Sequence, residues 1–230
     1  MARPRTPLLD RDRIRDTALA LIDAHGLQAL SMRRLAAELG VQAASLYSHY
    51  PTKNDVLDAV ANLLTRQVDT SGFAGGDWRT GLRTWGRSYR NALAAHPNAA
   101  PVVAAGTGER EDFLAMADAV HGGLVTAGWP ARQATMISAA TKYLVIGAAT
   151  TSFASGFADD TQVYLDRYPN LVNAHLIPAH AAEIDVDSFE LALDCLITGL
   201  EPHYRALTDG RPSRAGTGSP PGGHRRPAAT

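Results

Sequence analysis

Apolar residues spaced as on one face of an α-helix run through almost the whole chain, and this pattern decides its fold class. From about residue 10 to residue 207, apolar side chains recur at intervals of three and four positions. We find no alternating run bounded by turn dipeptides and no Asn-Gly hairpin signal, the patterns that indicate strands. The sequence therefore predicts an all-α protein.

Glycine, proline and capping residues divide this pattern into separate helices. The expected helices cover residues 10–25, 31–39, 43–50, 53–68, 78–95, 109–127, 131–155 and 187–207, with a short apolar segment at 99–105 and a less regular helix near 171–182. Residues 209–230 are rich in Gly, Pro, Ser and Arg and have no apolar period. We therefore expect a disordered tail over residues 209–230.

The formal charge of −1 hides an uneven distribution of charge along the chain. Residues 1–53 carry a net charge of +3, whereas residues 109–201 carry −9. A basic N-terminal part joined to an acidic body is typical of a small DNA-binding unit attached to a ligand or partner domain. The same charge pattern also fits a solvated surface that is simply unevenly charged.

Composition excludes several classes of protein. The single cysteine, Cys195, rules out an intrachain disulfide framework and a cysteine-based zinc site. No apolar run approaches the roughly 18 residues of a membrane span. The Arg-rich N-terminus lacks the apolar core of a signal peptide. We therefore expect a cytoplasmic protein without a membrane partner.

The most informative stretch is Leu30–Lys53, where two short helices meet at a glycine turn. Ser31 is expected to cap the first helix, and Gly40 takes the sharp turn into the second. This arrangement is the geometry of a helix-turn-helix, a DNA-binding motif. We therefore predict a helix-turn-helix domain at residues 10–55, followed by a helical domain at residues 56–207.

The second helix of this motif has an inward and an outward face. Leu46 and Tyr50, four residues apart, are expected to pack inward. The side chains left outside suit a DNA groove, because glutamine pairs with adenine, alanine contacts the thymine methyl, and serine, tyrosine and histidine bond phosphates. These outward residues are Gln42, Ala43, Ser45, Tyr47 and His49.

Several short motifs in this region occur together. They are Ala24-His25-Gly26-Leu27, Ser31-Met32-Arg33-Arg34-Leu35-Ala36, Leu39-Gly40-Val41, Leu46-Tyr47-Ser48-His49-Tyr50, and Lys53 followed by Asp55-Val56-Leu57. With them, the segment from Asp10 to about Val60 resembles the DNA-binding domain of the tetracycline-repressor (TetR) family of transcriptional regulators. Later stretches, LAAHPN, AGTGERE and FELALDCLITGLE, resemble that family's C-terminal domain more weakly. The resemblance implies a three-helix DNA-binding domain and a C-terminal helical domain for ligand binding and dimerisation.

The resemblance also implies roles for individual residues. Arg33 resembles the arginine of the support helix that contacts a base or a phosphate. Lys53 resembles the lysine at the start of the next helix that contacts a phosphate. Gln42 stands where many members have a Ser or Thr that caps the helix. For His49, the alternative to a DNA contact is a structural role at the helix end, in which its side chain bonds the backbone. The predicted DNA-binding residues are Arg33, Gln42, Ala43, Ala44, Ser45, Tyr47, His49 and Lys53.

The C-terminal domain offers aromatic and methionine side chains without a catalytic constellation. It has no nucleophile triad, metal-ligand spacing or phosphate-binding glycine loop, so we expect no enzyme, metal or cofactor. The rival class is an enzyme with an all-helical active site. A helical body with such side chains suits an apolar pocket for a small molecule, although each of them also suits a plain core. The candidate ligand-binding residues are Trp85, Tyr89, Val103, Phe113, Met116, Met136 and Tyr143.

The expected effector is an apolar or aromatic small molecule. Tetracycline-specific members of the family hold a magnesium–drug chelate with histidine. Here the corresponding segment has Ala104, and the end of the fourth helix is Gln67-Val68, which also lacks histidine. The resemblance therefore implies that a tetracycline–magnesium chelate is not the effector.

The expected mechanism is that of a homodimeric repressor that a small molecule releases from its operator. Two copies on a palindrome gain the affinity that one weakly basic domain lacks. The apolar helices at residues 131–155 and 187–207 are the expected dimer interface, as four helices across a two-fold axis. An activator, or a DNA-binding regulator without ligand control, is the alternative.

Overall fold

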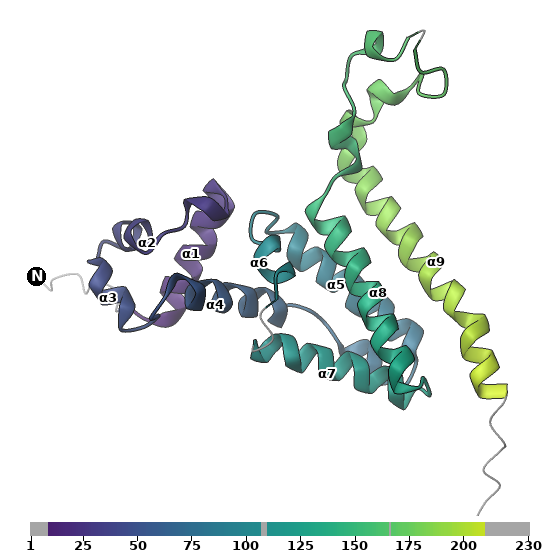
Figure 1. The fold of residues 1–230 in the computed structure, drawn as a ribbon, viewed down its shortest axis with the longest axis horizontal. Helices are drawn as coiled ribbons and strands as arrows, with labels where there is room; N and C mark the ends of the chain where they lie inside the picture. Colours follow the sequence, from purple (N-terminus) through teal and green to yellow (C-terminus); the bar gives the residue numbers. More distant parts are fainter. Residues whose placement is uncertain (1–8, 107–109, 166, 210–230) are drawn as a thin grey trace, which may run out of the picture.

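The computed structural model describes residues 9–106, 110–165 and 167–209 of the chain. All regular structure within these residues is helical. This confirms the all-α prediction. In Figure 1 the first three helices form a group at one end of the molecule, and α4 leads from this group to the remaining helices. The α-helices are α1 (Arg11–His25), α2 (Met32–Leu39), α3 (Ala43–Tyr47), α4 (Lys53–Arg66), α5 (Trp78–Ala94), α6 (Ala100–Ala104), α7 (Glu111–Thr126), α8 (Ala131–Thr150) and α9 (Ala181–Asp209).

Side-chain caps fix the starts of the N-terminal helices. The Asp10 carboxylate accepts a hydrogen bond at 2.8 Å from the backbone amide three residues on, so α1 begins at residue 11. Ser31 caps α2 in the same way at 3.2 Å, as the sequence predicted. Thr52 and Asp55 form a reciprocal capping box at the start of α4. Each cap satisfies an amide that the first helical turn leaves unpaired.

Gly40 makes the turn between α2 and α3, and buried side chains hold the two helices together. Its φ of 69° lies in the left-handed region, which favours glycine, and its amide bonds the last carbonyls of α2. Leu46 is fully buried, and Tyr50 is 2% exposed. The Tyr50 hydroxyl donates to the Arg11 carbonyl at 3.1 Å and so ties the residues after α3 to the start of α1. The predicted helix-turn-helix is therefore present, with its inward face as expected.

α4 packs on both the N-terminal helices and the rest of the molecule. It lies along α1 and also contacts α6 and α7. Its buried face includes Val56, Val60 and Leu64. The division expected between residues 55 and 56 falls inside this helix, so α4 takes part in the packing on both sides of that division.

α5, α7 and α8 pack together, and α9 lies along α8 and α5; together with α6 they form what we call the body. α8 and α9 run side by side in opposite directions (Figure 1). The described residues between these two helices, 151–165 and 167–180, protrude beyond the ends of both. This connection contains short 3-10 turns at Phe153–Gly156, Thr161–Val163, Ala174–Leu176 and Pro178–His180.

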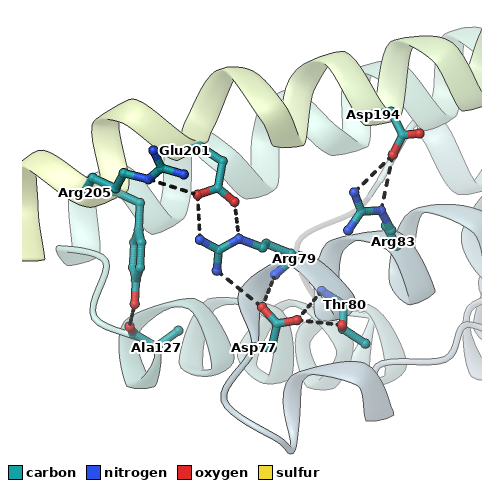
Figure 2. Close-up of polar contacts among 9 residues, drawn as sticks. Asp77, Arg79, Thr80, Arg83, Ala127, Asp194, Glu201 and Arg205 are labelled. Carbon is teal, nitrogen blue, oxygen red and sulfur yellow. Dashed lines mark hydrogen bonds and ion pairs between the residues drawn. The ribbon is translucent and has the colours of Figure 1, made fainter.

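A row of ion pairs fastens α9 to α5. Arginines spaced four residues apart on α5 lie on one face of that helix and meet acidic residues of α9. Figure 2 shows the Arg79 guanidinium between Glu201 and Asp77, the residue that caps α5. The pairs are Arg79–Glu201, Arg83–Asp194 and Arg87–Glu190.

An aromatic cluster lies beside this row and joins the start of α5 to the end of α9. Trp78 and Trp129 meet edge to face with ring centroids 5.3 Å apart. Tyr204 packs against both rings, at 5.5 Å and 5.3 Å, and its hydroxyl donates to the Ala127 carbonyl at 2.6 Å. Such ring pairs add to the stabilisation gained from burial alone, so this cluster anchors the C-terminal half of α9.

The helices α3 and α8 end well before the residues that the sequence predicted. α3 ends at Tyr47, because the Ser48 hydroxyl bonds back to a carbonyl of α3 and Pro51 lies just ahead. α8 ends at Thr150, where Thr150 and Thr151 hydroxyls bond carbonyls four residues back.

The last part of the chain also differs from expectation. In place of the helix near residues 171–182, the structure has 3-10 turns, because Pro178 interrupts the segment. α9 begins at Ala181, before the expected cap at Asp187, since Ala and Glu favour a helix without that cap. Asp209 is the last residue of α9, and the remainder of the expected tail, residues 210–230, lies outside the described residues.

Candidate nucleic-acid interface and ligand-binding body

Most of the predicted DNA-binding residues lie on the surface of α2 and α3. Tyr47 has 50% of its surface exposed, although the neighbouring Leu46 is fully buried. An exposed tyrosine beside a buried leucine is the arrangement expected of a recognition helix that keeps one face for a partner. The exposed members of the predicted set are Arg33, Gln42, Ala44, Ser45 and Tyr47.

The remaining predicted residues are partly buried at the edges of this surface. Ala43 packs against the core at the start of α3. His49 lies just after α3, where its amide donates to the Leu46 carbonyl at 2.9 Å and closes the turn. Lys53 is the first residue of α4, directly after the Thr52 cap. The structure therefore groups the predicted residues around α3, with Arg33 contributed by α2.

Gln42 is the residue before α3 and leaves its side chain free for another partner. Its backbone is extended, with φ −79° and ψ 145°, and its side chain makes no capping hydrogen bond to the described helix. The sequence has Gln42 where many family members have a Ser or Thr cap, and in the structure the Gln42 side chain does not cap α3. An exposed amide that does not cap its helix is available for hydrogen bonding outside the chain.

The candidate ligand-binding residues fall into two groups. Four of them, on α5, α6 and α7, are buried in the core, and Phe113 of α7 packs against it. Tyr143, with 74% of its surface exposed, and Met136, with 55%, lie on the outside of α8. The structure therefore does not bring Met136 and Tyr143 together with the interior group. The buried four are Trp85, Tyr89, Val103 and Met116.

Two donors in the interior group have no hydrogen-bond partner among the described residues. They are the Trp85 indole N–H and the Tyr89 hydroxyl, whose rings lie 6.2 Å apart on successive turns of α5. Tyr89 is fully buried, and this burial raises the pKa of its hydroxyl to about 12, because water cannot stabilise the phenolate. A buried donor without a partner costs free energy, about 1–3 kcal/mol. Such donors mark a place where a hydrogen-bond acceptor from outside the chain would be stabilised.

Arg110 is a functional candidate that the sequence reasoning missed. It precedes α7, is 7% exposed, and bonds the Asp58 carboxylate of α4 and the Val102 carbonyl of α6. Its positive charge partly opposes the rise in the Tyr89 pKa. Arg110 lies within the stretch AGTGERE that resembles the family's C-terminal domain, but nothing in that stretch indicates that the arginine is buried.

Lys142 of α8 brings a second cation to the same part of the body. Its ammonium lies 4.7 Å from the centre of the Phe113 ring. Partial burial lowers the pKa of Lys142, and the charge of Arg110 lowers it further. The body therefore holds two cations, together with donors that lack a hydrogen-bond partner among the described residues, near residues that were predicted to contact a ligand.

An apolar groove lies between α8 and α9. It has a volume of about 500 Å³, and Met136 lies on its α8 side with Leu196 and Leu200 on its α9 side. Sequence reasoning named these two helices as the dimer interface and did not single out Leu196 or Leu200. Leu196 and Leu200 are four residues apart on an apolar helix near the end of the chain, and this spacing places them on one face of that helix. That pattern was the signal that could have identified them.

Two further searches cover only the residues that the structure describes. Within them, no three His, Cys, Asp or Glu side chains lie close enough to hold a metal ion. Within the same residues, no helix combines the length and the apolar character that crossing a membrane requires.

Family models match both parts of the chain. Residues 14–60 match the bacterial regulatory proteins of the tetR family, and residues 74–204 match the tetracyclin repressor-like C-terminal domain. The first match contains α2, α3 and the exposed surface described above, and the second contains α5 through most of α9.

Individual relatives agree with these matches. An HTH-type transcriptional regulator of Saccharopolyspora erythraea is 34% identical over 61% of this chain, which spans 60% of that regulator's length. The class A tetracycline repressor of transposon 1721 from Escherichia coli is 32% identical over 80% of this chain and 86% of its own.

The fold agrees as well. The Streptomyces coelicolor TetR family protein ActR, in its complex with actinorhodin, has a TM-score of 0.68 and 29% identity, covering 86% of this chain and 99% of ActR. The relative from Saccharopolyspora erythraea is an HTH-type transcriptional regulator, and residues 14–60 of this chain match the family model of bacterial tetR regulators. This chain therefore belongs to the TetR family of DNA-binding transcriptional regulators.

Proposed function

We propose that this regulator is a homodimeric repressor that binds a palindromic operator and is released by a small-molecule effector. Residues 10–55 act as the DNA-binding domain, and residues 56–207 bind the effector and form the dimer. The observation that carries this proposal is the exposed surface of α2 and α3, held in place by buried Leu46 and Tyr50.

The exposed residues suit both positioning on DNA and reading of bases. Arg33 is suited to a base or phosphate contact, and Gln42 can pair with adenine. Ala43, Ala44 and Ser45 occupy the base-reading part of α3. Tyr47, His49 and Lys53 serve the phosphate backbone, since hydroxyl, imidazole and ammonium groups all bond phosphate oxygens.

The dimer forms through the groove between α8 and α9. Its lining is largely apolar, and Met136 beside it is exposed, which costs free energy until a second copy covers it. A two-fold arrangement places the same groove on both copies, so the surface must be self-complementary. Four such helices across the axis would fix the separation of the two DNA-binding domains.

The effector binds inside the body and carries hydrogen-bond acceptors on an apolar or aromatic frame. Support comes from the Trp85 and Tyr89 donors, which have no partner within the described part of the chain, with Val103, Phe113 and Met116 supplying apolar surface. The nearby cations Arg110 and Lys142 favour an acceptor or an anion over a cationic magnesium chelate. ActR, a structural relative, is known in complex with actinorhodin. Tetracycline binding that depends on Mg²⁺ would contradict this view of the effector.

A gel shift tests the function directly. Full-length protein is mixed with the DNA upstream of its own gene, with and without a panel of aromatic acids and their neutral amides. Arg33→Ala should weaken binding about tenfold or more, the loss expected for a base or phosphate contact. Arg132→Ala is the matched control, because Arg132 is an exposed arginine of α8 outside the DNA-binding surface.

The outcomes separate the alternatives. Release of DNA by an effector, with transcription rising in its presence, supports the repressor. Transcription that falls when the protein is removed would instead identify an activator, and binding that no effector alters would favour a regulator without ligand control. Equal affinity of Arg33→Ala and the wild-type chain would refute the proposed DNA-binding surface.

A further inference from the structure

Lys142 is a partly buried cation in an acidic part of the chain. Residues 109–201 contain four lysines and arginines against thirteen acidic residues. Two of these cations, Arg132 and Arg167, are exposed to solvent. The other two are Arg110, which is buried, and Lys142, which is partly buried. An acidic segment therefore keeps half of its cations away from solvent.

The Lys142 ammonium lies against α7 and not on the outer side of α8. It is 4.7 Å from the centre of the Phe113 ring. Met136 and Tyr143, on the outer side of α8, are instead 55% and 74% exposed. An aromatic ring attracts an ammonium by about 0.5–2 kcal/mol, which compensates only part of the hydration that a buried charge loses. The charge of Lys142 is therefore incompletely balanced where it lies.

The carboxylates where α4 and α7 meet are already paired with arginines. Asp58 accepts a hydrogen bond from Arg110 at 2.8 Å. Asp112, which directly precedes Phe113, accepts one from Arg66 at 2.9 Å. Lys142 makes no ion pair or hydrogen bond with any residue that the structure describes. Charged groups that leave water are normally paired, so this ammonium marks a place for an anion from outside the chain.

Two buried donors of α5 lie at the same level of the helix pair as Lys142. α5 packs along α8, and a Cβ added at Gly86 of α5 would lie 3.8 Å from Cγ2 of Thr141 on α8. Trp85 directly precedes this glycine, and Lys142 directly follows this threonine. The Trp85 N–H and the Tyr89 hydroxyl have no hydrogen-bond partner among the described residues. All three groups are donors, so the partner that suits them is an acceptor.

The field of Arg110 adds positive potential to this region. Burial raises the pKa of Tyr89 to about 12 and lowers the pKa of Lys142, and the charge of Arg110 acts on both groups. A neutral acceptor satisfies the two α5 donors and leaves the ammonium unbalanced. A carboxylate balances the ammonium and also accepts hydrogen bonds, so it suits the whole set of groups.

We propose that the effector is an aromatic carboxylic acid bound as its anion, and that Lys142 is the specificity-determining residue that neutralises its carboxylate. Trp85 and Tyr89 donate to oxygen atoms of the same molecule, and Phe113 contacts its ring. This inference rests on the proposed function, because the site is the one proposed there for the effector. It goes further by fixing the charge of the effector and by assigning the recognition of that charge to one side chain.

Binding of matched acid and amide pairs to the full-length chain tests this assignment. The probes are naphthoate and anthraquinone carboxylate, each compared with its neutral amide by isothermal titration calorimetry. Each pair keeps the shape of the ligand and changes its charge. For the wild type we expect an acid to bind about tenfold or more tightly than its amide, the effect of one partly buried charge pair. Binding of neither acid, or equal binding of acid and amide, would overturn the proposal.

Substitutions then identify the residue that recognises the charge. Lys142→Met keeps an apolar stem without the ammonium, so acid affinity should fall about tenfold, to the level of the amide. Lys142→Gln is a second uncharged variant if Lys142→Met does not fold, and Lys142→Arg should retain the preference for the acid. Tyr89→Phe removes a donor without removing charge, so it should weaken acid and amide alike. Arg132→Met, which removes an exposed cation of the same helix, should bind as the wild type does.

The outcomes separate this inference from the proposed function. A preference for the acid that persists in Lys142→Met and Lys142→Gln, or that is lost equally in Arg132→Met, would overturn the role of Lys142. Gel shifts with the same probes add the second level. If an acid binds through Lys142 and leaves the DNA bound, release by the effector fails and the ligand class stands. If acid and amide release DNA equally from the wild type and Lys142→Met, release stands and the role of Lys142 fails.

Discussion

The segment between α4 and α5 is held in the body by one aromatic ring that lies between two glycines, and this contact makes a sharp prediction. Phe73 is 6% exposed and lies against Gly81 of α5 and Gly123 of α7. A Cβ added at Gly123 would lie 2.5 Å from the Phe73 Cβ and 2.7 Å from its ring, well inside van der Waals contact. At Gly122, the preceding residue of the same helix, an added Cβ would meet no described heavy atom within 4 Å.

The magnitudes follow from this difference. Replacing glycine by alanine within a helix gains up to about 1 kcal/mol in helix propensity. At Gly123 the gain is opposed by overpacking, which costs about 1–3 kcal/mol, and Phe73 cannot retreat because Gly81 closes the other side. We therefore expect Gly123→Ala to lower the free energy of unfolding by about 1–2 kcal/mol, and Gly122→Ala to raise it by about 0.5–1 kcal/mol.

Urea unfolding followed by circular dichroism measures both variants against the wild type. The two substitutions insert the same methyl group one residue apart, so their opposite signs isolate the contact with Phe73. Phe73→Leu in the Gly123→Ala background should recover part of the loss, because a smaller side chain makes room for the methyl group. Equal unfolding free energies for Gly122→Ala and Gly123→Ala would refute the reasoning.

Further predictions concern the DNA-binding domain, the dimer and the α5–α9 ion pairs. Tyr50→Phe removes the hydroxyl that donates to the first turn of α1, and should lower the unfolding free energy by about 0.5–1.5 kcal/mol in a urea titration. Met136→Glu should convert the dimer into monomers in analytical sedimentation, because dimerisation would bury the new charge in the α8–α9 groove. The control variant Leu114→Glu, at an exposed residue of α7, should remain dimeric. Arg79 lowers the pKa of Glu201, so this pair stabilises the protein at neutral pH and the stabilisation is lost as the pH falls through the lowered pKa. Thermal melts of Glu201→Gln should therefore depend less on acid pH than those of the wild type.

The N-terminal helices were the most predictable part of the molecule. Asp10 and Ser31 each cap a helix through a hydrogen bond to a residue three positions on, and Gly40 ends a helix with a left-handed turn. Because these interactions involve only nearby residues, the sequence predicts them. The inward positions of Leu46 and Tyr50 follow from helical spacing alone. The positions of the predicted DNA-binding side chains therefore follow largely from local sequence.

The body was less predictable because its key contacts join distant residues. Arg110 meets Asp58 over a separation of 52 residues, and no periodicity in the sequence encodes such a pairing. Met136 and Tyr143 show a related limit, since aromatic or sulfur character does not tell which side of α8 a residue faces. The start of α9 at Ala181 shows that helix propensity can begin a helix ahead of a good capping residue.

The measurement that tests the central claim most directly is selection of bound duplexes from a random DNA pool by the full-length protein, followed by sequencing. We predict enrichment of two inverted half-sites at one fixed spacing, with enrichment lost in Arg33→Ala and binding that weakens steeply with salt. Absence of any enriched sequence, or enrichment of a single half-site without an inverted copy, would contradict the proposed dimeric reading of an operator.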